Sequence, residues 1–273
     1  MDWPSRRRPV PPAPVGREHS APPARTPSSA AAAPARSVER APATAEILRR
    51  ISNGLKELLS ALDGAERAEI LDLGPVSQAT VDFFTSRGFR LHTQDLLRSW
   101  REFLAEELAR PVAPAVAQSG SAASRGPLQE AAPTGGASAA PAGLEAEAEQ
   151  AQLRPARFFA RHLWYEPKKF HGALLWDSLD YLDAAAGAAL VARLGEILRP
   201  GGVALVHLHD KPPERFWRYR VLDAQTFECV PAAAPVAFQR VIANREIMNL
   251  FHDFRTSKTF VGRDQIREVL FLR

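Results

Sequence analysis

Two acidic residues and one glycine carry the main chemical signal of this chain. The stretch EILDLGPVSQATVDFF, residues 69–84, reads as a short apolar strand, a glycine turn and the start of a helix. Gly74 brings backbone amides to the strand end, and the helix start adds partial positive charge. Asp95 follows 21 residues after Gly74, close to the spacing at which a carboxylate accepts hydrogen bonds from ribose hydroxyls. Asp72 and Asp95 are therefore expected to bracket a nucleoside.

The turn itself is poor in glycine for a nucleotide cradle. Val76 and Gln78 stand where further glycines are usual, and a Cβ at position 76 restricts φ and narrows the approach of a ligand. Pro75 can hold the loop in one geometry, so a remodelled pocket can still bind. The alternative makes Gly74 an ordinary strand-to-helix turn and Asp95 the cap of the next helix. The two roles of Asp95 are compatible.

A second group of candidates ends later strands. Trp176 and Asp177 are expected to face the same crevice, where Trp176 can pack on a cation or an aromatic acceptor and Asp177 can orient an amine or hydroxyl. The alternative places Trp176 in the core and makes Asp177 a turn cap. His207 and His209 share one face of a strand, but with no third ligand identified they predict no metal site. Lys211 stays an unassigned cation.

Strands and helices alternate through the middle of the chain. An amphipathic helix is expected over 44–62, ended by Asp63-Gly64. Strands are expected at AEILDLG, FRLHTQD, 173–176 and VALVHLHD, and helices at 77–87, 96–108, RFFARHLW and from Asp183 to RPGG. This spacing indicates right-handed crossovers and an α/β fold: a Rossmann-like, mostly parallel sheet with helices on both faces.

The C-terminal part has a different pattern. RYRVLDAQTFECVP predicts a hairpin with its turn near 223–225, and NREIMNLFHDF predicts a helix capped by Asn244. The segments SKTFVGR and REVLFLR are joined by about three residues, a connection that only an antiparallel pair can accommodate. The sheet is therefore expected to close with a C-terminal antiparallel β-hairpin.

Low-complexity segments interrupt this pattern. Residues 1–42 hold ten of the 23 prolines, and residues 111–151 hold five prolines and the run EAEAEQ. Neither segment can bury enough apolar surface to offset chain entropy. We predict a disordered tail over 1–42 and one domain over 43–273, interrupted by a disordered insertion over 111–151.

The basic charge is confined to the tail. Residues 1–40 hold seven arginines and three acidic residues, which accounts for the whole net charge of +4. The rest of the chain is neutral overall, so we expect no specific nucleic-acid partner. Cys229 is the single cysteine, which excludes an internal disulfide. No segment approaches the roughly 18 apolar residues of a membrane span, so a soluble cytoplasmic protein is expected.

The order of these elements resembles the class I S-adenosylmethionine-dependent methyltransferases over about residues 65–273, apart from the insertion. ILDLGP at 70–75 matches the first cofactor motif, FHGALLWDSLDYL the fourth motif, and ILRPGGVALVHL the fifth strand with its preceding helix and turn. The resemblance implies S-adenosylmethionine as the cofactor and methyl transfer to an unidentified acceptor. The cofactor-binding residues it implies are Asp72, Gly74, Pro75, Val76, Asp95, Trp176 and Asp177.

The sequence also departs from that family. Val76 and Gln78 replace two glycines of the first motif, His171 replaces the aspartate that opens the fourth, and no third strand is recognisable. No catalytic base is assigned, because methyl transfer to a good nucleophile often needs positioning more than proton removal. Two functions are therefore predicted: a methyltransferase, or a non-catalytic protein of the same fold that works as a binding or scaffold module.

Overall fold

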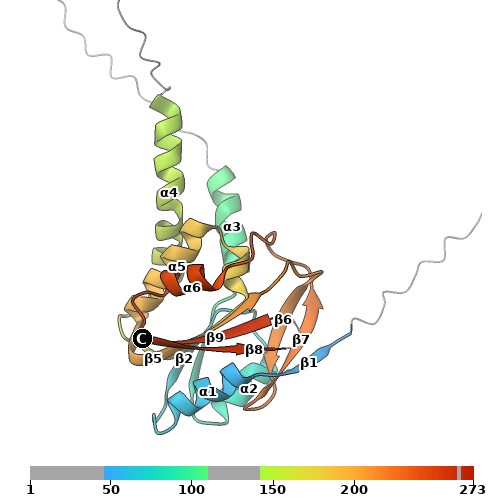
Figure 1. Ribbon diagram of the computed structural model, residues 1–273. Helices are drawn as coiled ribbons and strands as arrows, with labels where there is room; N and C mark the ends of the chain where they lie inside the picture. The colour runs from blue at the N-terminus through green and yellow to red at the C-terminus, as the bar shows by residue number, and fades with distance from the viewer. Residues whose placement is uncertain (1–45, 110–141, 263–265) are drawn as a thin grey trace, which may run out of the picture. The chain divides into compact units, whose positions relative to one another are not determined.

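The computed structural model describes residues 46–109, 142–262 and 266–273, with side chains described from residue 151 onward in the second range (Figure 1). The predicted tail over 1–42 and most of the predicted insertion lie outside the described residues. Residues 142–151 belong to the insertion as predicted, but they are helical, so the prediction is wrong for this part.

A six-stranded, mostly parallel sheet forms the centre of the domain. Its strands are β2 (Glu69–Asp72), β3 (Arg90–Thr93), β4 (Phe170–Trp176), β5 (Leu198–His209), β8 (Thr256–Val261) and β9 (Ile266–Leu272). They lie in the order β3-β2-β4-β5-β9-β8. Only β9 is reversed, antiparallel to both β5 and β8, so β8 again runs parallel to the first four strands. The predicted α/β fold with its C-terminal antiparallel hairpin is confirmed, and it is the fold that the resemblance to class I methyltransferases implies.

Helices cover both faces of this sheet (Figure 1). One face carries α3 (Leu96–Ala109), α4 (Ala142–His162), α5 (Ala184–Ile197) and α6 (Asn244–Leu250), and the other carries α1 (Asn53–Leu62) and α2 (Gln78–Thr85). Two separate apolar clusters correspond to the two faces. In the described part of the chain, no helix is both long enough and apolar enough to cross a membrane.

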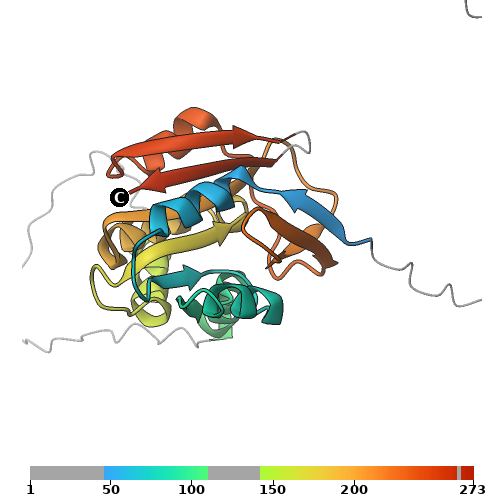
Figure 2. The same ribbon diagram turned by 90° about the horizontal axis from the view of Figure 1, so that it is seen from below.

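A small antiparallel sheet stands beside the main one. It contains β1 (Leu48–Ile51), β6 (Phe216–Val221) and β7 (Thr226–Ala232) in the order β1-β7-β6, and Figure 2 shows β1 lying along the hairpin. The predicted hairpin is confirmed. Its turn is held by Asp223, whose Oδ1 accepts a hydrogen bond from the Gln225 amide at 2.8 Å.

The helix predicted over 44–62 is wrong in its first part. Residues Leu48–Ile51 form strand β1, paired with residues 226–229 of β7. Ser52 then caps α1 by accepting a hydrogen bond from the Leu55 amide at 2.8 Å. Leu48 and Ile51 are three residues apart, a spacing that fits a helix face, and pairing with a distant strand overrides that local signal.

Two smaller predictions also change. Asn244 does not cap α6, because Ala243 holds that position and the Asn244 side chain accepts a hydrogen bond from Arg267 instead. RPGG ends α5 as predicted, but its residues already belong to the irregular start of β5, where Gly201 adopts a φ of 80°.

Candidate cofactor crevice

The predicted site begins where β2 ends. Asp72 is the last residue of β2 and is buried. Its Oδ1 accepts two hydrogen bonds, one from the Gly74 amide at 2.9 Å and one from Trp176 Nε1 at 2.7 Å. One carboxylate therefore fixes both the glycine turn and an indole ring from the end of β4.

The Trp176 ring occupies the space beside Gly74. A Cβ placed on Gly74 would lie 2.8 Å from both Cδ1 and Nε1 of that ring. Trp176 itself is only 3% exposed. Glycine is needed at position 74 because an indole approaches the backbone there, at the turn where the sequence predicts a ligand.

An aromatic cluster holds the indole in this position. The Trp176 ring stacks on Tyr219 with the ring centroids 4.9 Å apart and an interplanar angle of 5°. It meets His207 and Phe227 edge-on. Trp176 adopts a φ of 51°, a left-handed conformation that costs a bulky residue about 1–3 kcal/mol. Burial and stacking of the ring offset that cost.

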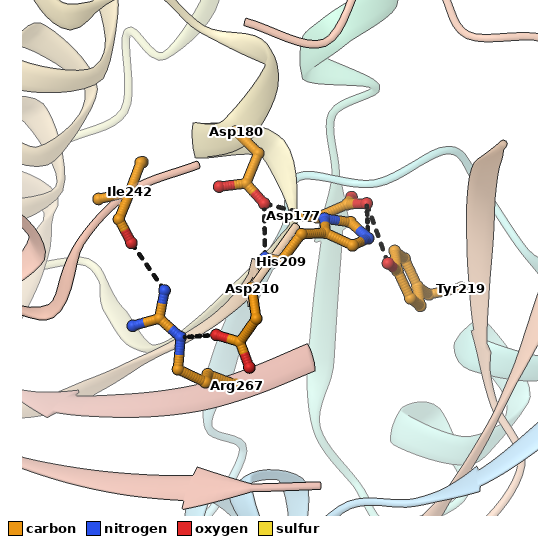
Figure 3. A network of polar contacts seen from close by, with 7 residues as sticks. All are labelled: Asp177, Asp180, His209, Asp210, Tyr219, Ile242 and Arg267. Atoms are coloured by element: carbon orange, nitrogen blue, oxygen red, sulfur yellow. Dashed lines mark hydrogen bonds and ion pairs between the residues drawn. The ribbon is translucent and has the colours of Figure 1, made fainter. Parts of the chain in front are cut away.

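A chain of buried polar groups continues from the cluster (Figure 3). The Tyr219 hydroxyl donates to Asp177 Oδ2 at 2.9 Å, and this oxygen lies 3.9 Å from His209 Nε2. Asp180 Oδ2 accepts from the His209 amide at 2.8 Å and contacts His209 Nδ1 at 2.9 Å. Asp177 and Asp180 therefore hold His209 between them.

Burial suppresses charge throughout this region. It raises the pKa of Asp72 to about 6, although the hydrogen bonds from Gly74 and Trp176 act in the opposite direction. It also raises the pKa of Asp177 to about 7, opposed by His209 and Tyr219. Burial lowers the pKa of His207 to about 3, and neither ring nitrogen of His207 has a hydrogen-bond partner among the described residues. The buried side chains of this region therefore carry less charge than their residue types suggest.

The remaining predicted residues lie around the rim. Asp95 is half-buried, and its Oδ1 accepts a hydrogen bond from the Arg98 amide at 3.3 Å, which confirms the capping role. Pro75 is half-buried. Val76 is 60% exposed and Gln78 is exposed, so neither side chain fills the crevice.

The structure therefore brings part of the predicted set together. Asp72, Gly74 and Trp176 are in direct contact, and Asp177 joins them through Tyr219. Sequence reasoning missed Tyr219. The alternation along β6 indicates that one of its faces is buried, but not that this face packs on Trp176.

The two strand histidines are occupied by other contacts. His207 packs among aromatic rings, and His209 is held by Asp180. Within residues 46–109, 142–262 and 266–273, no group of three or more His, Cys, Asp or Glu side chains is arranged to hold a metal ion.

No protein-family model and no curated protein matches the chain. Among solved structures, it is similar to the 1,6-didemethyltoxoflavin-N1-methyltransferase of Burkholderia thailandensis, with 14% identity over 81% of this chain and 76% of that chain and a TM-score of 0.38. It is also similar to the glycopeptide N-methyltransferase MtfA, with 17% identity over 81% of this chain and 94% of that chain and a TM-score of 0.33. An S-adenosylmethionine-dependent methyltransferase of Methanosarcina mazei is similar too, with 14% identity over 76% of this chain and 93% of that chain and a TM-score of 0.33. Scores this low describe a distant likeness.

Proposed function

We propose that the protein is a binding module of methyltransferase fold in which Trp176 closes the cofactor crevice, so that this conformation transfers no methyl group. One observation carries the proposal: the Trp176 ring lies against Gly74 and donates to Asp72, where an adenosyl ligand would meet the backbone. In this conformation the indole, and not a ligand, meets the backbone at the turn.

Opening the crevice has a substantial free-energy cost. The indole must leave the stack on Tyr219 and its hydrogen bond to Asp72, which leaves a buried carboxylate with one fewer donor. Losses of this kind amount to roughly 2–4 kcal/mol. A ligand that binds only the open form would lose that much binding energy, a weakening of roughly 30-fold to 1000-fold.

A second candidate is the S-adenosylmethionine-dependent methyltransferase expected from the sequence. The strained φ of Trp176 supports it, because this residue would relax if the indole swung out of the crevice. S-adenosylmethionine would then bind between Gly74 and Asp95, with Asp72, Pro75 and Val76 shaping the turn and Asp177 at the far end. Its methyl acceptor is not identified.

Calorimetric titration of the full chain with S-adenosylmethionine and S-adenosylhomocysteine separates the two candidates. We expect no saturable heat from the native chain up to about 1 mM ligand, and measurable binding by Trp176→Ala. Trp164→Ala is the matched control, because Trp164 is 78% exposed and follows the end of α4. Micromolar binding by the native chain that is lost in Asp95→Ala would overturn the binding-module proposal and establish the cofactor site.

The proposal keeps two further expectations from the sequence: a cytoplasmic location and no specific nucleic-acid partner. Fractionation of cells that produce the chain tests the first expectation. Gel-shift titration with random-sequence DNA and RNA at physiological salt tests the second, where sequence-specific, salt-resistant binding would contradict it.

A further inference from the structure

A cavity of about 260 Å³ opens beyond the end of β5. Residues of the connection from β5 to β6 form much of its wall, among them Lys211 and Arg215. Trp217 of β6, Arg50 of β1 and His209 of β5 also line it. Elements of both sheets therefore meet around this cavity, and Gly74 and Trp176 are not among its lining residues.

The lining of the cavity carries more positive than negative charge. It includes three cations, Arg50, Lys211 and Arg215, and one acidic residue, Glu214. Lys211 and Arg215 are exposed, and neither forms an ion pair with any of the described residues. Two side chains with uncompensated charge at one cavity mouth attract an anion, and a guanidinium can bind carboxylate or phosphate with two parallel hydrogen bonds.

One wall of the cavity is flat and apolar. Trp217 is half-buried, and the guanidinium carbon of Arg215 lies 5.6 Å from the centroid of its ring. Pro212, Pro213 and Ile266 extend this apolar lining. A molecule that satisfies both parts of the cavity therefore has an anionic head and a flat or apolar body.

His209 forms the base of the cavity. The residue lines the cavity although it is only 5% exposed. Asp180 fixes its Nδ1, while its Nε2 has no hydrogen-bond partner among the described residues. Nε2 lies 3.9 Å from Asp177 Oδ2, so Asp177 and Asp180 together hold the imidazole in place at the base of the cavity.

We propose that this cavity binds a small organic anion, a carboxylate or phosphate ester on a planar apolar body. Lys211 and Arg215 would bind the anionic head, Trp217 would pack against the body, and His209 would lie at the base. The volume is slightly below the usual range of roughly 300–1000 Å³ for ligand pockets, which fits a molecule built on a single ring. This site does not depend on whether the Gly74 crevice binds a cofactor.

Titration of the full chain with benzoate and phenyl phosphate, followed by calorimetry or ligand-observed NMR, tests the proposal. We expect saturable binding of at least one probe at millimolar concentration or below, weakened at least about tenfold in the double variant Lys211→Gln/Arg215→Gln. Arg218→Gln is the matched control, because Arg218 is an exposed cation on β6 that does not line the cavity. Circular dichroism confirms that each variant is folded.

Comparison of the probes identifies the head group and tests the apolar wall. Binding of only one of the two probes supports the site and assigns its anion. Inorganic phosphate and benzyl alcohol, which lack the body and the charge respectively, should bind at least about tenfold more weakly than the better probe. The proposal is overturned if neither benzoate nor phenyl phosphate saturates, if the double variant binds as the native chain does, or if inorganic phosphate binds as tightly as phenyl phosphate.

Discussion

The crevice beside Gly74 and the cavity at Lys211 and Arg215 differ in what occupies them. At the end of β2 the crevice beside Gly74 is filled by Trp176, and its buried carboxylates hold protons up to about pH 6 and 7. Beyond β5, the cavity at Lys211 and Arg215 stays open and presents cations without ion pairs among the described residues. A glycine turn at a strand end is thus packed into the core, while the cavity proposed to bind an anion lies where charged side chains reach solvent.

The largest effect is expected when the indole of Trp176 is removed. Trp176→Ala is expected to lower the free energy of unfolding by about 3–5 kcal/mol, since a large buried ring leaves a cavity. Urea denaturation measures the loss, and Trp164→Ala, at an exposed site, should change stability by less than about 0.5 kcal/mol. A loss below about 1 kcal/mol for Trp176→Ala would show that the Trp176 side chain is not packed in the core.

A companion variant tests the backbone at the same position. Because Trp176 has a φ of 51°, glycine is favoured there over alanine by about 1 kcal/mol, the reverse of the usual order. Trp176→Gly should therefore unfold at a higher urea concentration than Trp176→Ala. The opposite order would contradict the left-handed conformation.

The next test uses the buried carboxylates. Between about pH 4 and pH 7 the folded protein keeps a proton on Asp177 that the unfolded chain releases, so rising pH favours unfolding. Asp72 acts in the same direction up to about pH 6. His207 opposes both, because the folded protein leaves it neutral down to about pH 3, so its contribution to stability grows as the pH rises to about 6.5.

Asp177→Asn isolates one of these contributions. The stability of this variant relative to the native chain is expected to rise by roughly 3 kcal/mol between about pH 4 and pH 7.5, because the variant has no carboxyl to ionise. Urea midpoints at several pH values measure the difference. A difference that stays constant with pH would show that burial does not raise the pKa of Asp177.

Substitutions at the open cavity, in contrast, should leave the stability of the protein almost unchanged. Lys211→Gln/Arg215→Gln is expected to change the free energy of unfolding by less than about 0.5 kcal/mol, because neither side chain is buried or ion-paired among the described residues. Thermal or urea denaturation measures it. A loss above about 2 kcal/mol would mean that these cations stabilise the fold and that the contrast between the two hollows fails.

The smallest effect is expected at the rim of the crevice. Val76 is 60% exposed, so Val76→Gly should change stability by less than about 1 kcal/mol, chiefly through the entropy of the unfolded chain. It should also leave the affinity for S-adenosylmethionine unchanged, because Trp176 and not Val76 fills the crevice. Calorimetric titration checks this, and tighter binding by the variant would identify Val76 as the obstruction.

Local patterns predicted most of the architecture. The alternation of β2, α2, β3 and α3, and of β4, α5 and β5, is encoded in short-range periodicity and in turn residues such as Gly88. Strand β1 was missed because its partner β7 lies about 180 residues further along the chain, beyond any local signal. That pairing adds β1 to the hairpin of β6 and β7 and makes the small sheet three-stranded.

The site was predictable in composition but not in arrangement. Asp72, Gly74 and Trp176 were placed at neighbouring strand ends, which follows from a parallel sheet. The direction of the indole could not be predicted, because it depends on an unusual φ and on Tyr219 from a hairpin whose packing leaves no local pattern. Val76 and Gln78 depart from the motif but do not fill the crevice. Trp176 fills it, although its position at the end of β4 is the one that the sequence predicted.

Strand β6 ties the two hollows together, because Tyr219 and Trp217 lie two residues apart and therefore on the same face of that strand. A molecule seated against Trp217 would hold β6 in place, and with it the ring on which Trp176 rests. If that molecule binds better when the indole rests on Tyr219, reciprocity requires release of the indole to weaken its binding by the same factor. Strand β6 would then couple two places in the molecule that share no lining residue.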